Sequence, residues 1–339
     1  GSVEHLKNPS LKNIGEYFET YYVPNNMGVF ISGDIDPKAC METIDAHFSR
    51  WEARELPEAK SYEEPPLQGR EEVVVTYEGE EYIMLAFRTV PKLHPDAEAL
   101  QMVDMILDNA AAGLINLNLN QSQRVRQAGS MPEQYNDYGN QILWGIPKEG
   151  QTLEEVEALL LEQLELIKKG EFDDWLIPAI INDFKKNIKA GLESNSSRVR
   201  SMTETWIAFE DWDHAVDKIP RMEKITKADV MRVAKQYFGT DYVAALRKDA
   251  PHEVPNIPKP AFDPINIDPT RQSEFAAKVM AIPAEPIEPE FLSKKDYEKS
   301  TNPNGMTFFH ADNPINDLFT LNISVDFGTL QDNKIALAA

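Results

Sequence analysis

Apolar side chains recur every three or four positions in several parts of the chain, which is the spacing of amphipathic helices. Two of these stretches open with a capping box, in which a threonine and an acidic residue three positions later satisfy free backbone N–H groups. The two pairs are Thr152 with Glu155 and Thr226 with Asp229. The pattern predicts helices over residues 11–22, 36–48, 96–107, 152–169, 173–192, 195–210 and 226–238.

Shorter apolar runs predict β-strands at Met27–Ser32, Glu72–Tyr77, Glu81–Val90, Gln141–Ile146 and Tyr242–Arg247. A short turn with a central glycine, residues 78–80, separates the second run from the third and predicts a hairpin between them. Strands interspersed with longer helices predict the fold class. It is α/β, as an α+β two-layer sandwich in which helices back a mixed or antiparallel sheet.

The proline content changes after residue 249. Ten of the chain's 23 prolines fall within residues 250–303, and proline prevents helix and sheet hydrogen bonding, so this segment is predicted to be a stiff, extended connector. Apolar residues between the prolines favour a strap along the protein surface over a disordered tail. Beyond the connector, Met306–His310 and Leu318–Phe327 predict a second strand pair, and Asn333–Ala339 predicts the beginning of a helix.

Composition narrows the classes of function. The formal net charge is −22, so the surface would repel a phosphate backbone and no nucleic-acid partner is expected. No apolar run reaches the ~18 residues that span a bilayer, so no membrane segment is expected in this chain. The single cysteine, Cys40, excludes an internal disulfide and a cysteine-based zinc site. Its helical spacing from Ile44 and Phe48 predicts a small core residue rather than a nucleophile.

Three segments near the start of the chain carry a family resemblance: Glu4–Ser10, Tyr21–Met27 and Ile31–Asp36. Together they resemble the insulinase/pitrilysin zinc peptidases, which show a helix, a Tyr-x-Pro-x-Asn-Met segment and a strand ending in Gly-Asp. The resemblance covers roughly residues 4–248. The tail from Asn313 to Ala339 is similar to the opening hairpin of that family.

The resemblance implies a parent protein made of two similar halves, each of two α/β domains, that close around a peptide. Zinc is held there by an inverted H-x-x-E-H helix and a downstream Glu, and the Glu of the motif activates water. It also implies four segments here. They are a tag remnant and a helix of the preceding domain (1–26), a second, non-catalytic peptidase domain (27–248), a proline-rich linker between halves (249–305) and a truncated third domain (306–339).

The zinc motif itself is missing from this sequence. Histidines at i and i+4 on a helix can converge on one ion, but no two of the six histidines here are four residues apart. Glu4-His5 imitates the end of the motif, yet the residues after it match a later part of the family. We therefore expect no catalytic residue, no metal ligand and no cofactor in this chain, with zinc confined to the parent protein.

The substrate-binding positions also depart from the family. Relatives often carry an Arg and, seven residues later, a Tyr that contact the bound peptide. The matching positions here are Asn120 and Gln127, so the substrate-binding residues are unknown. Arg124 and Arg126 lie nearby. Either they contact peptide or they are ordinary exposed arginines on a helix, and the second reading is favoured.

Two acidic clusters have alternative readings. Glu78, Glu80 and Glu81 could suggest calcium, although a solvated turn is favoured because no Asp/Asn-Gly ligand loop surrounds them. Asp211, Asp213 and His214 could suggest a metal cluster, although a polar helix end is favoured.

Two functions remain open. The chain is expected to be the substrate-chamber domain of an insulinase-like zinc metalloendopeptidase, inactive alone, whose partners are a peptide or unfolded-protein substrate, the catalytic domain and the second half. The alternative is a non-catalytic scaffold or assembly subunit related to the processing peptidases. The sequence leaves the compartment open, and a bacterial periplasm or cell envelope is compatible with the parent.

Overall fold

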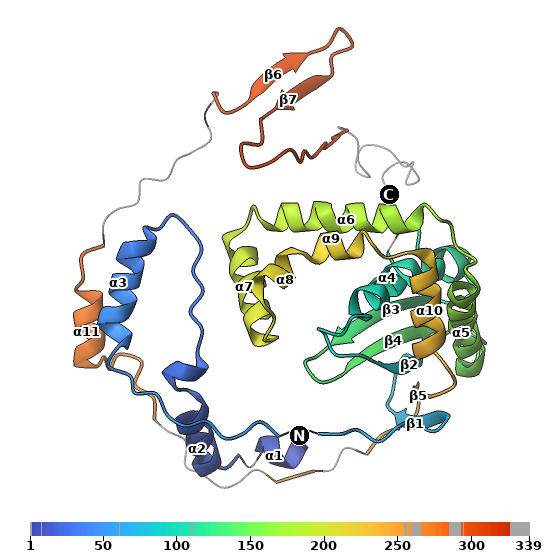
Figure 1. The fold of residues 1–339 in the computed structure, drawn as a ribbon, viewed down its shortest axis with the longest axis horizontal. Helices are drawn as coiled ribbons and strands as arrows, with labels where there is room; N and C mark the ends of the chain where they lie inside the picture. The colour runs from blue at the N-terminus through green and yellow to red at the C-terminus, as the bar shows by residue number, and fades with distance from the viewer. Residues whose placement is uncertain are drawn as a thin grey trace. The chain divides into compact units, whose positions relative to one another are not determined.

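The computed structural model describes residues 2–7, 9–60, 62–109, 111–253, 256–258, 266–284, 293 and 295–325. The chain divides into two compact units, residues 1–259 and 260–339, and each is described by itself. Figure 1 shows the helices and strands along the chain. Within the described part, none of the helices combines the length and the apolar character that crossing a bilayer requires.

A five-stranded mixed sheet lies at the centre of the first unit. Its strands are arranged in the order β1-β5-β2-β4-β3, with β1 and β5 parallel and the other neighbours antiparallel. A mixed sheet backed by helices confirms the predicted fold class. The strands are β1 (Arg70–Thr76), β2 (Tyr82–Thr89), β3 (Gln127–Gln134), β4 (Gly139–Ile146) and β5 (Tyr242–Lys248).

Three helices pack on one face of this sheet (Figure 1): α4 (Ala97–Leu107), α5 (Leu153–Lys169) and α10 (Lys227–Tyr237). Alternate residues of each central strand point toward them, because successive side chains of a strand face opposite ways. In β2 these residues are Ile83, Leu85 and Phe87, and all three are fully buried. The core of the unit therefore lies between these helices and this face of the sheet.

Local capping chemistry sets the ends of several helices as predicted. The capping boxes at Thr152 and Thr226 are both formed, and they confirm the predicted starts of α5 and α10. Gly170 ends α5 with φ 73°, a left-handed conformation that glycine adopts without strain. The other helices of this unit are α1 (Val3–Lys7), α2 (Leu11–Tyr21), η1 (Pro24–Asn26), α3 (Pro37–Phe48), the π-helix η2 (Asn116–Gln121), α6 (Leu176–Gly191), α7 (Asn195–Ile207), α8 (Trp212–Val216) and α9 (Lys218–Met222).

The predicted hairpin between β1 and β2 is wrong, because β5 lies between these two strands. The turn after β1 passes around the end of β5 instead. The N–H of Tyr77 donates to the carbonyl of Lys248 at 3.1 Å, and the N–H of Gly79 donates to Asp249 Oδ1 at 2.9 Å. β5 carries apolar side chains on both faces, and such a strand is favoured in the interior of a sheet rather than at its edge.

The predicted strand Met27–Ser32 is also wrong, since these residues form neither a strand nor a helix. Their backbone makes no ladder with the five-stranded sheet. The segment from α2 to α3 is mostly exposed, and Cys40 in α3 is partly exposed rather than in the core. Phe30 touches Trp206 of α7, with ring centroids 6.2 Å apart. Strand-forming side chains alone do not make a strand when no partner edge is within reach.

The described residues of the second unit form a two-stranded sheet and one helix. β7 (Thr307–His310) pairs with β6 (Glu298–Thr301), so the predicted pairing with 318–327 is wrong; residues 318–325 form no strand, and 326–339 lie outside the described residues. α11 (Glu274–Met280) contradicts a wholly extended connector. It lies in a proline-free stretch between Pro269 and Pro283, where Ser273 caps its first turn.

Candidate functional site

Four of the six histidines lie in four different helices and strands and the other two lie in loops, and the described residues form no metal-binding cluster. They contain no cluster of three or more His, Cys, Asp or Glu side chains able to hold an ion. His214 Nδ1 and Glu210 Oε1 are 2.8 Å apart, but the Lys92 ammonium lies 3.7 Å from the other oxygen of Glu210. A cation at that carboxylate opposes a bound metal. The described residues therefore do not fit the zinc that the family resemblance implies for the parent.

The two acidic clusters have ordinary structural partners. Glu80 forms an ion pair with Arg126, and Glu81 accepts the N–H of Asp249 at 3.1 Å. Asp211 caps α8 by accepting the N–H of Asp213 at 2.9 Å. These contacts favour the readings of a charged turn and a polar helix end.

The positions that match the peptide-contacting residues of the family lie where η2 meets β3. Asn120 Nδ2 donates to the carbonyl of Ala128 at 2.9 Å, and its Oδ1 accepts the N–H of Ala128 at 2.8 Å. This pair fastens η2 to the strand, so the Asn120 amide is engaged within the fold. Gln127 is exposed at the start of β3.

The two nearby arginines lie in the turn between η2 and β3, not on a helix. Arg124 forms an ion pair with Glu162 at 3.0 Å, and Arg126 pairs with Glu80. Both guanidinium groups are at the surface and already matched by acids. Either could contact a peptide only by exchanging an existing partner.

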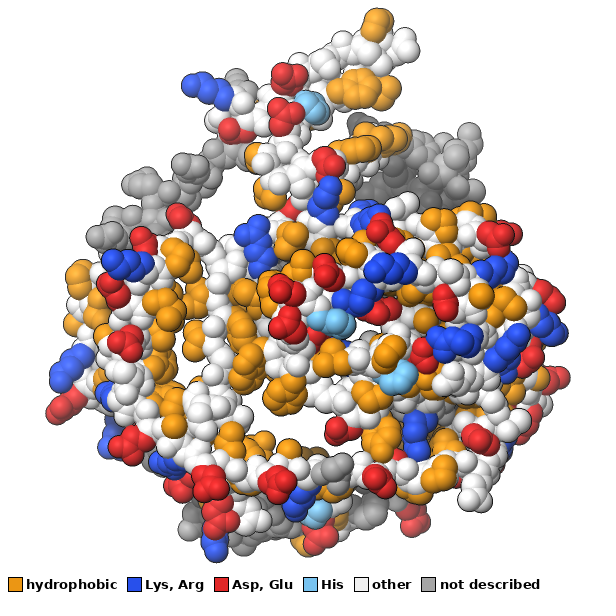
Figure 2. Space-filling view, in the orientation of Figure 1, with side chains coloured by type: hydrophobic (Ala, Val, Ile, Leu, Met, Phe, Trp, Pro, Cys, Tyr) orange, Lys and Arg blue, Asp and Glu red, His pale blue; other side chains and the backbone are white. Residues whose placement is uncertain are grey.

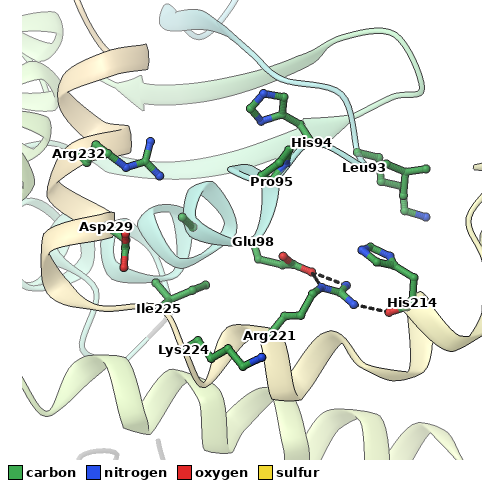
Figure 3. Close-up of a pocket in the computed structure, with 12 residues that line it drawn as sticks. Leu93, His94, Pro95, Glu98, His214, Arg221, Lys224, Ile225, Asp229 and Arg232 are labelled. Atoms are coloured by element: carbon green, nitrogen blue, oxygen red, sulfur yellow. Dashed lines mark hydrogen bonds and ion pairs between the residues drawn. The ribbon is translucent and has the colours of Figure 1, made fainter.

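A pocket of about 400 Å³ lies between the start of α4 and the helices α8 to α10 (Figure 3). Arg221 crosses its floor and donates to Glu98, with Nε to Oε1 at 2.8 Å. On another wall, Arg232 donates to Asp96 at 2.6 Å, and this contact, opposed by partial burial, leaves the pKa of Asp96 below its usual value. The lining residues are Lys92, Leu93, His94, Pro95, Glu98, Ala99, His214, Arg221, Lys224, Ile225, Asp229 and Arg232.

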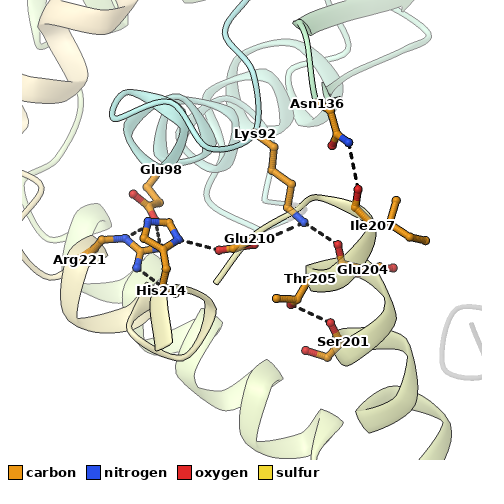
Figure 4. A network of polar contacts seen from close by, with 10 residues as sticks. All are labelled: Lys92, Glu98, Asn136, Ser201, Glu204, Thr205, Ile207, Glu210, His214 and Arg221. Carbon is orange, nitrogen blue, oxygen red and sulfur yellow. Dashed lines mark hydrogen bonds and ion pairs between the residues drawn. The ribbon is translucent and has the colours of Figure 1, made fainter. Parts of the chain in front are cut away.

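A polar network continues from this pocket to α7 (Figure 4). Lys92 lies beside both Glu210 and the carbonyl of Glu204, and Arg221 donates to the carbonyl of His214. Burial lowers the pKa of Lys218, whose ammonium lies 5.6 Å from the centre of the Phe184 ring. Acidic and basic side chains alternate in this network and over the face shown in Figure 2. Such mixed charge suits a structural role, in which the network holds α7–α9 on α4, better than it suits the binding of an anion.

A second buried network joins α4 to the sheet. Asp104 accepts hydrogen bonds from Ser130 Oγ at 2.8 Å and from Gln141 Nε2 at 2.7 Å. Burial raises the pKa of Asp104; the two hydrogen bonds oppose that shift and nearby Asp108 adds to it. The alternation pattern placed Gln141 on a strand, but nothing in the sequence indicated that a buried carboxyl would lie opposite it.

Replacing Asp104 by asparagine should change stability in a pH-dependent way. A carboxyl whose pKa is raised by folding stabilises the fold below its unfolded pKa, and this contribution is lost as pH rises through the folded pKa. The substituted amide cannot ionise, so the stability of Asp104→Asn relative to the unaltered chain should increase from pH 4 to pH 8. Urea unfolding at several pH values measures this. The exposed Asp137→Asn is the control, and a pH-independent difference for Asp104→Asn would contradict the expectation.

The face of the sheet opposite α4, α5 and α10 has an apolar centre, and the alternation of the strands puts Glu71, Arg88, Glu133 and Arg247 at its margins. The strand register aligns Val73, Ala245, Met84, Trp144 and Gly129 in one row across all five strands. Trp144 lies so close over Gly129 that a Cβ there would approach the indole to 2.8 Å. We call this surface the free face, formed by Val73, Val75, Met84, Ala86, Met131, Ile142, Trp144, Val243 and Ala245.

The free face stays outside the buried core. None of its side chains belongs to the buried apolar cluster of the described residues. Val73, Val75 and Met131 are 49%, 50% and 38% exposed, and the other side chains of the face are half-buried. A sheet face this apolar usually packs against another layer.

Known proteins match more than two thirds of this chain. The chain is 25% identical over 247 residues to the zinc protease PqqE of Helicobacter pylori, covering 70% of the chain, and 23% identical over 261 residues to the uncharacterized zinc protease YmfH of Bacillus subtilis, covering 73%. It spans only 54% and 58% of these two relatives. A solved protease structure from Helicobacter pylori superposes with a TM-score of 0.69 at 23% identity, covering 73% of this chain and 61% of that one.

A sequence profile for the family described as "Peptidase M16 inactive domain" matches residues 10–184. These 175 residues (184 − 10 + 1) are more than half of the 339 in the chain. The match agrees with the zinc-protease relatives and confirms the resemblance to insulinase-type peptidases without their zinc motif. The chain therefore belongs to the M16 peptidase family, through its inactive domain.

Proposed function

We propose that this chain is the non-catalytic wall of the substrate chamber in an M16-type zinc peptidase. Its role is to pack against the zinc-bearing catalytic domain and to hold a peptide in reach of that domain. The zinc would polarise the peptide carbonyl and activate water in the catalytic domain, and no step of that chemistry uses a residue of this chain.

The observation that carries the proposal is the free face. An apolar surface crossing five strands is unfavourable in water, and covering it with a second layer removes that cost at roughly 25 cal/mol per Å². A stable interface of standard size buries ~800 Å² on each partner. The matched part makes up 54% and 58% of the two relatives, which leaves room for a catalytic domain in each of them. We assign that domain as the occupant of the free face.

The segment before the sheet supports the same partner. Leu11, Ile14 and Phe18 lie on one side of α2, and they are 82%, 54% and 56% exposed. Met27, Val29 and Ile31 alternate along the following segment and are also exposed. An amphipathic helix and an alternating segment are patterns that a neighbouring domain would complete.

The test begins with the chain alone. It should contain substoichiometric zinc by mass spectrometry and should not cleave casein-derived peptides. The coding sequence on both sides of the chain then supplies the catalytic domain, and the joined protein should show chelator-sensitive cleavage. Stoichiometric zinc in the chain alone would contradict the proposal. A degenerate H-x-x-E-H in the catalytic domain, encoded upstream of residue 1, would favour the scaffold function instead.

The free face is tested within the joined protein. Trp144→Glu should lower cleavage on the order of tenfold or more, because an unpaired charge at the centre of an interface costs about 2 kcal/mol or more. Trp212→Glu, at a tryptophan that is 49% exposed and lies outside the free face, is the control for the added charge. Thermal melting of both variants distinguishes a loss of docking from a loss of folding, because only a loss of folding lowers the melting temperature of the chain. Equal cleavage by the two variants would exclude the free face as the contact.

A further inference from the structure

Phe209 has a backbone conformation that phenylalanine rarely adopts. Its φ is 54°, in the left-handed region, where a residue with a Cβ is strained and glycine is not. The residue ends α7: its N–H donates to the carbonyl of Trp206 at 3.0 Å, and the N–H of Glu210 donates to the carbonyl of Thr205 at 3.1 Å. These two hydrogen bonds form a Schellman motif, in which this position is usually glycine. Glycine would therefore end α7 with less strain than the phenylalanine that is present.

The Phe209 side chain does not offset this strain by packing within the fold. It is 86% exposed, so its ring contributes almost nothing to the core of the first unit. A strained residue that does not stabilise its own chain indicates a function outside it. A phenyl ring has a large apolar surface and few rotatable bonds, which suits the anchor residue of an interface.

An apolar pocket lies directly beside this ring. It has a volume of about 550 Å³ and lies between the end of α7 and the turn that joins β3 to β4, with Tyr135, Ile207 and Ala208 in its lining. The side chain of Asn136 donates to the carbonyl of Ile207 at 3.0 Å and holds the two walls together (Figure 4). The pocket is wide enough to receive a phenyl ring, and Phe209 directly follows Ala208. A protruding ring and a hollow are therefore neighbours on one surface.

The charges around the pocket do not select a charged ligand. Lys92 and Glu204 both line it, and their charges are opposite. Residues 201–217 contain five acids and no lysine or arginine, which disfavours an anionic membrane surface. Glu210 is already paired with Lys92 and lies 2.8 Å from His214, so it does not attract a basic partner. The pocket therefore suits an apolar side chain.

The exposed apolar area fits a small dimer interface. Phe209, Tyr135 and Ile207 are 86%, 57% and 55% exposed. Since a whole aromatic side chain buries 150–250 Å², these three side chains together expose roughly 400 Å². Apolar atoms make up ~57% of an interface, so this area corresponds to a contact of roughly 700 Å² on each copy. Stable pairs bury ~600–1,000 Å² on each partner, and this contact lies at the lower end of that range.

We propose that this surface joins two copies of the chain around a twofold axis, with Phe209 of each copy inserted into the pocket of the other. A twofold interface needs a patch that is complementary to itself. A ring beside a pocket meets this condition, because a twofold axis midway between them exchanges the two. The small contact gives a dissociation constant in the micromolar range. The dimer goes beyond the substrate-chamber role, which uses the free face, and does not rest on it.

The sharpest test removes the ring and the strain together. Sedimentation velocity of the unaltered chain should show a monomer–dimer equilibrium at micromolar concentrations. Phe209→Gly should weaken dimerisation on the order of a hundredfold, because two anchor rings are lost and each contributes about tenfold. The same substitution should raise the melting temperature of the monomer, measured at submicromolar concentration, by about 1–4 °C, since glycine is unstrained at this φ. A variant that gains stability does not owe its lost association to misfolding.

Phe319→Gly is the matched control. Phe319 is 90% exposed in the second unit, and its φ is not left-handed. This variant should dimerise within about twofold of the unaltered chain and should show no gain in melting temperature. Equal dimerisation by Phe209→Gly and Phe319→Gly would overturn the proposal, and so would an unaltered chain that stays monomeric up to high micromolar concentration.

Mixing two variants tests the twofold arrangement itself. Ile207→Glu places a charge in the pocket and keeps the Phe209 ring, whereas Phe209→Gly keeps the pocket and removes the ring. Neither variant should dimerise alone, but a mixed pair can form one of the two ring-in-pocket contacts. The mixture should therefore associate about tenfold more tightly than either variant alone. A mixture that is no tighter would exclude the twofold arrangement.

Other occupants of the surface give different results. The joined protein should also dimerise, with the same dependence on Phe209. If it stays monomeric while the chain alone dimerises, a domain of the parent covers the surface and the proposal is overturned. Phe209-dependent flotation with phosphatidylcholine vesicles, without dimerisation, would identify a lipid surface and overturn it as well. Dimerisation is measured on the chain alone and the chamber role by cleavage in the joined protein, so the failure of one leaves the other standing.

Discussion

Phe87→Ala should destabilise the first unit by about 3–5 kcal/mol, the range for removing a fully buried phenyl ring. Phe87 is 0% exposed, and its ring lies 5.5 Å from that of Phe238 and 4.9 Å from that of Tyr242. These contacts join β2 to the residue that caps the end of α10 and to β5. Little can relax into the space left behind, because three elements of the core meet there. Urea unfolding followed by circular dichroism measures the change.

Phe209→Ala is the matched control for Phe87→Ala. Phe209 is 86% exposed, so truncating it should change the free energy of unfolding by less than about 0.5 kcal/mol. Similar losses in the two variants would show that β2 does not pass through the core.

Arg70→Ala should cost about 2–4 kcal/mol, slightly below the range for a fully buried pair because the Arg70 side chain is 32% exposed. Arg70 holds Glu157 with two hydrogen bonds, from Nε at 2.6 Å and from Nη2 at 2.8 Å. Tyr242 donates a third at 2.7 Å, and burial together with Glu157 raises the pKa of Tyr242 to about 12. Removing Arg70 leaves a nearly buried carboxylate with one donor.

The loss should depend on pH. Burial alone would raise the pKa of Glu157, but the hydrogen bonds from Arg70 and Tyr242 outweigh it and leave that pKa below the usual 4.5. A carboxyl with a lowered pKa stabilises the fold above its unfolded pKa, and this stabilisation is lost as pH falls through the folded pKa. The difference between Arg70→Ala and the unaltered chain should be full at pH 7 and shrink below about pH 4.5.

The double variant Arg70→Ala, Glu157→Leu provides the control. It removes both charges together, so it should lose less stability than Arg70→Ala alone. A double variant that is no more stable than Arg70→Ala would show that the exposed start of β1, not the ion pair, determines the loss. Denaturant unfolding of the four proteins in this cycle gives the coupling energy.

The parts of the fold that could be predicted from sequence are those determined by neighbouring residues. The side chains of Thr152 and Glu155 each accept a hydrogen bond from the backbone N–H of the other residue, so the start of α5 can be predicted from four consecutive residues. β4 follows from alternation over a short run. The pairing of strands was harder to predict from sequence. Residues 78–80 have the local pattern of a hairpin turn, but the strand that pairs with β1 and β2 is β5, which lies far along the chain.

The candidate site escaped prediction for the same physical reason. The free face consists of ordinary apolar residues, and only the register of five strands places Val73, Met84 and Trp144 in one row. From the sequence alone, Asp104 is an ordinary polar position of α4. Only the structure shows that Ser130 and Gln141 lie opposite it and donate hydrogen bonds to its carboxylate. The missing zinc motif, by contrast, could be recognised from histidine spacing alone.

The insertion of β5 between β1 and β2 has a consequence for synthesis on the ribosome. Ile83 of β2 pairs with Leu246 of β5, which is 163 residues later (246 − 83). At ~5–20 residues per second, the nascent chain waits on the order of ten seconds or more before this central strand emerges. During that interval β2 has one unpaired side and β1 has no neighbour. The growing polypeptide should therefore be a strong client for chaperones until translation passes residue 248, and ribosome stalling just before Tyr242 should promote aggregation.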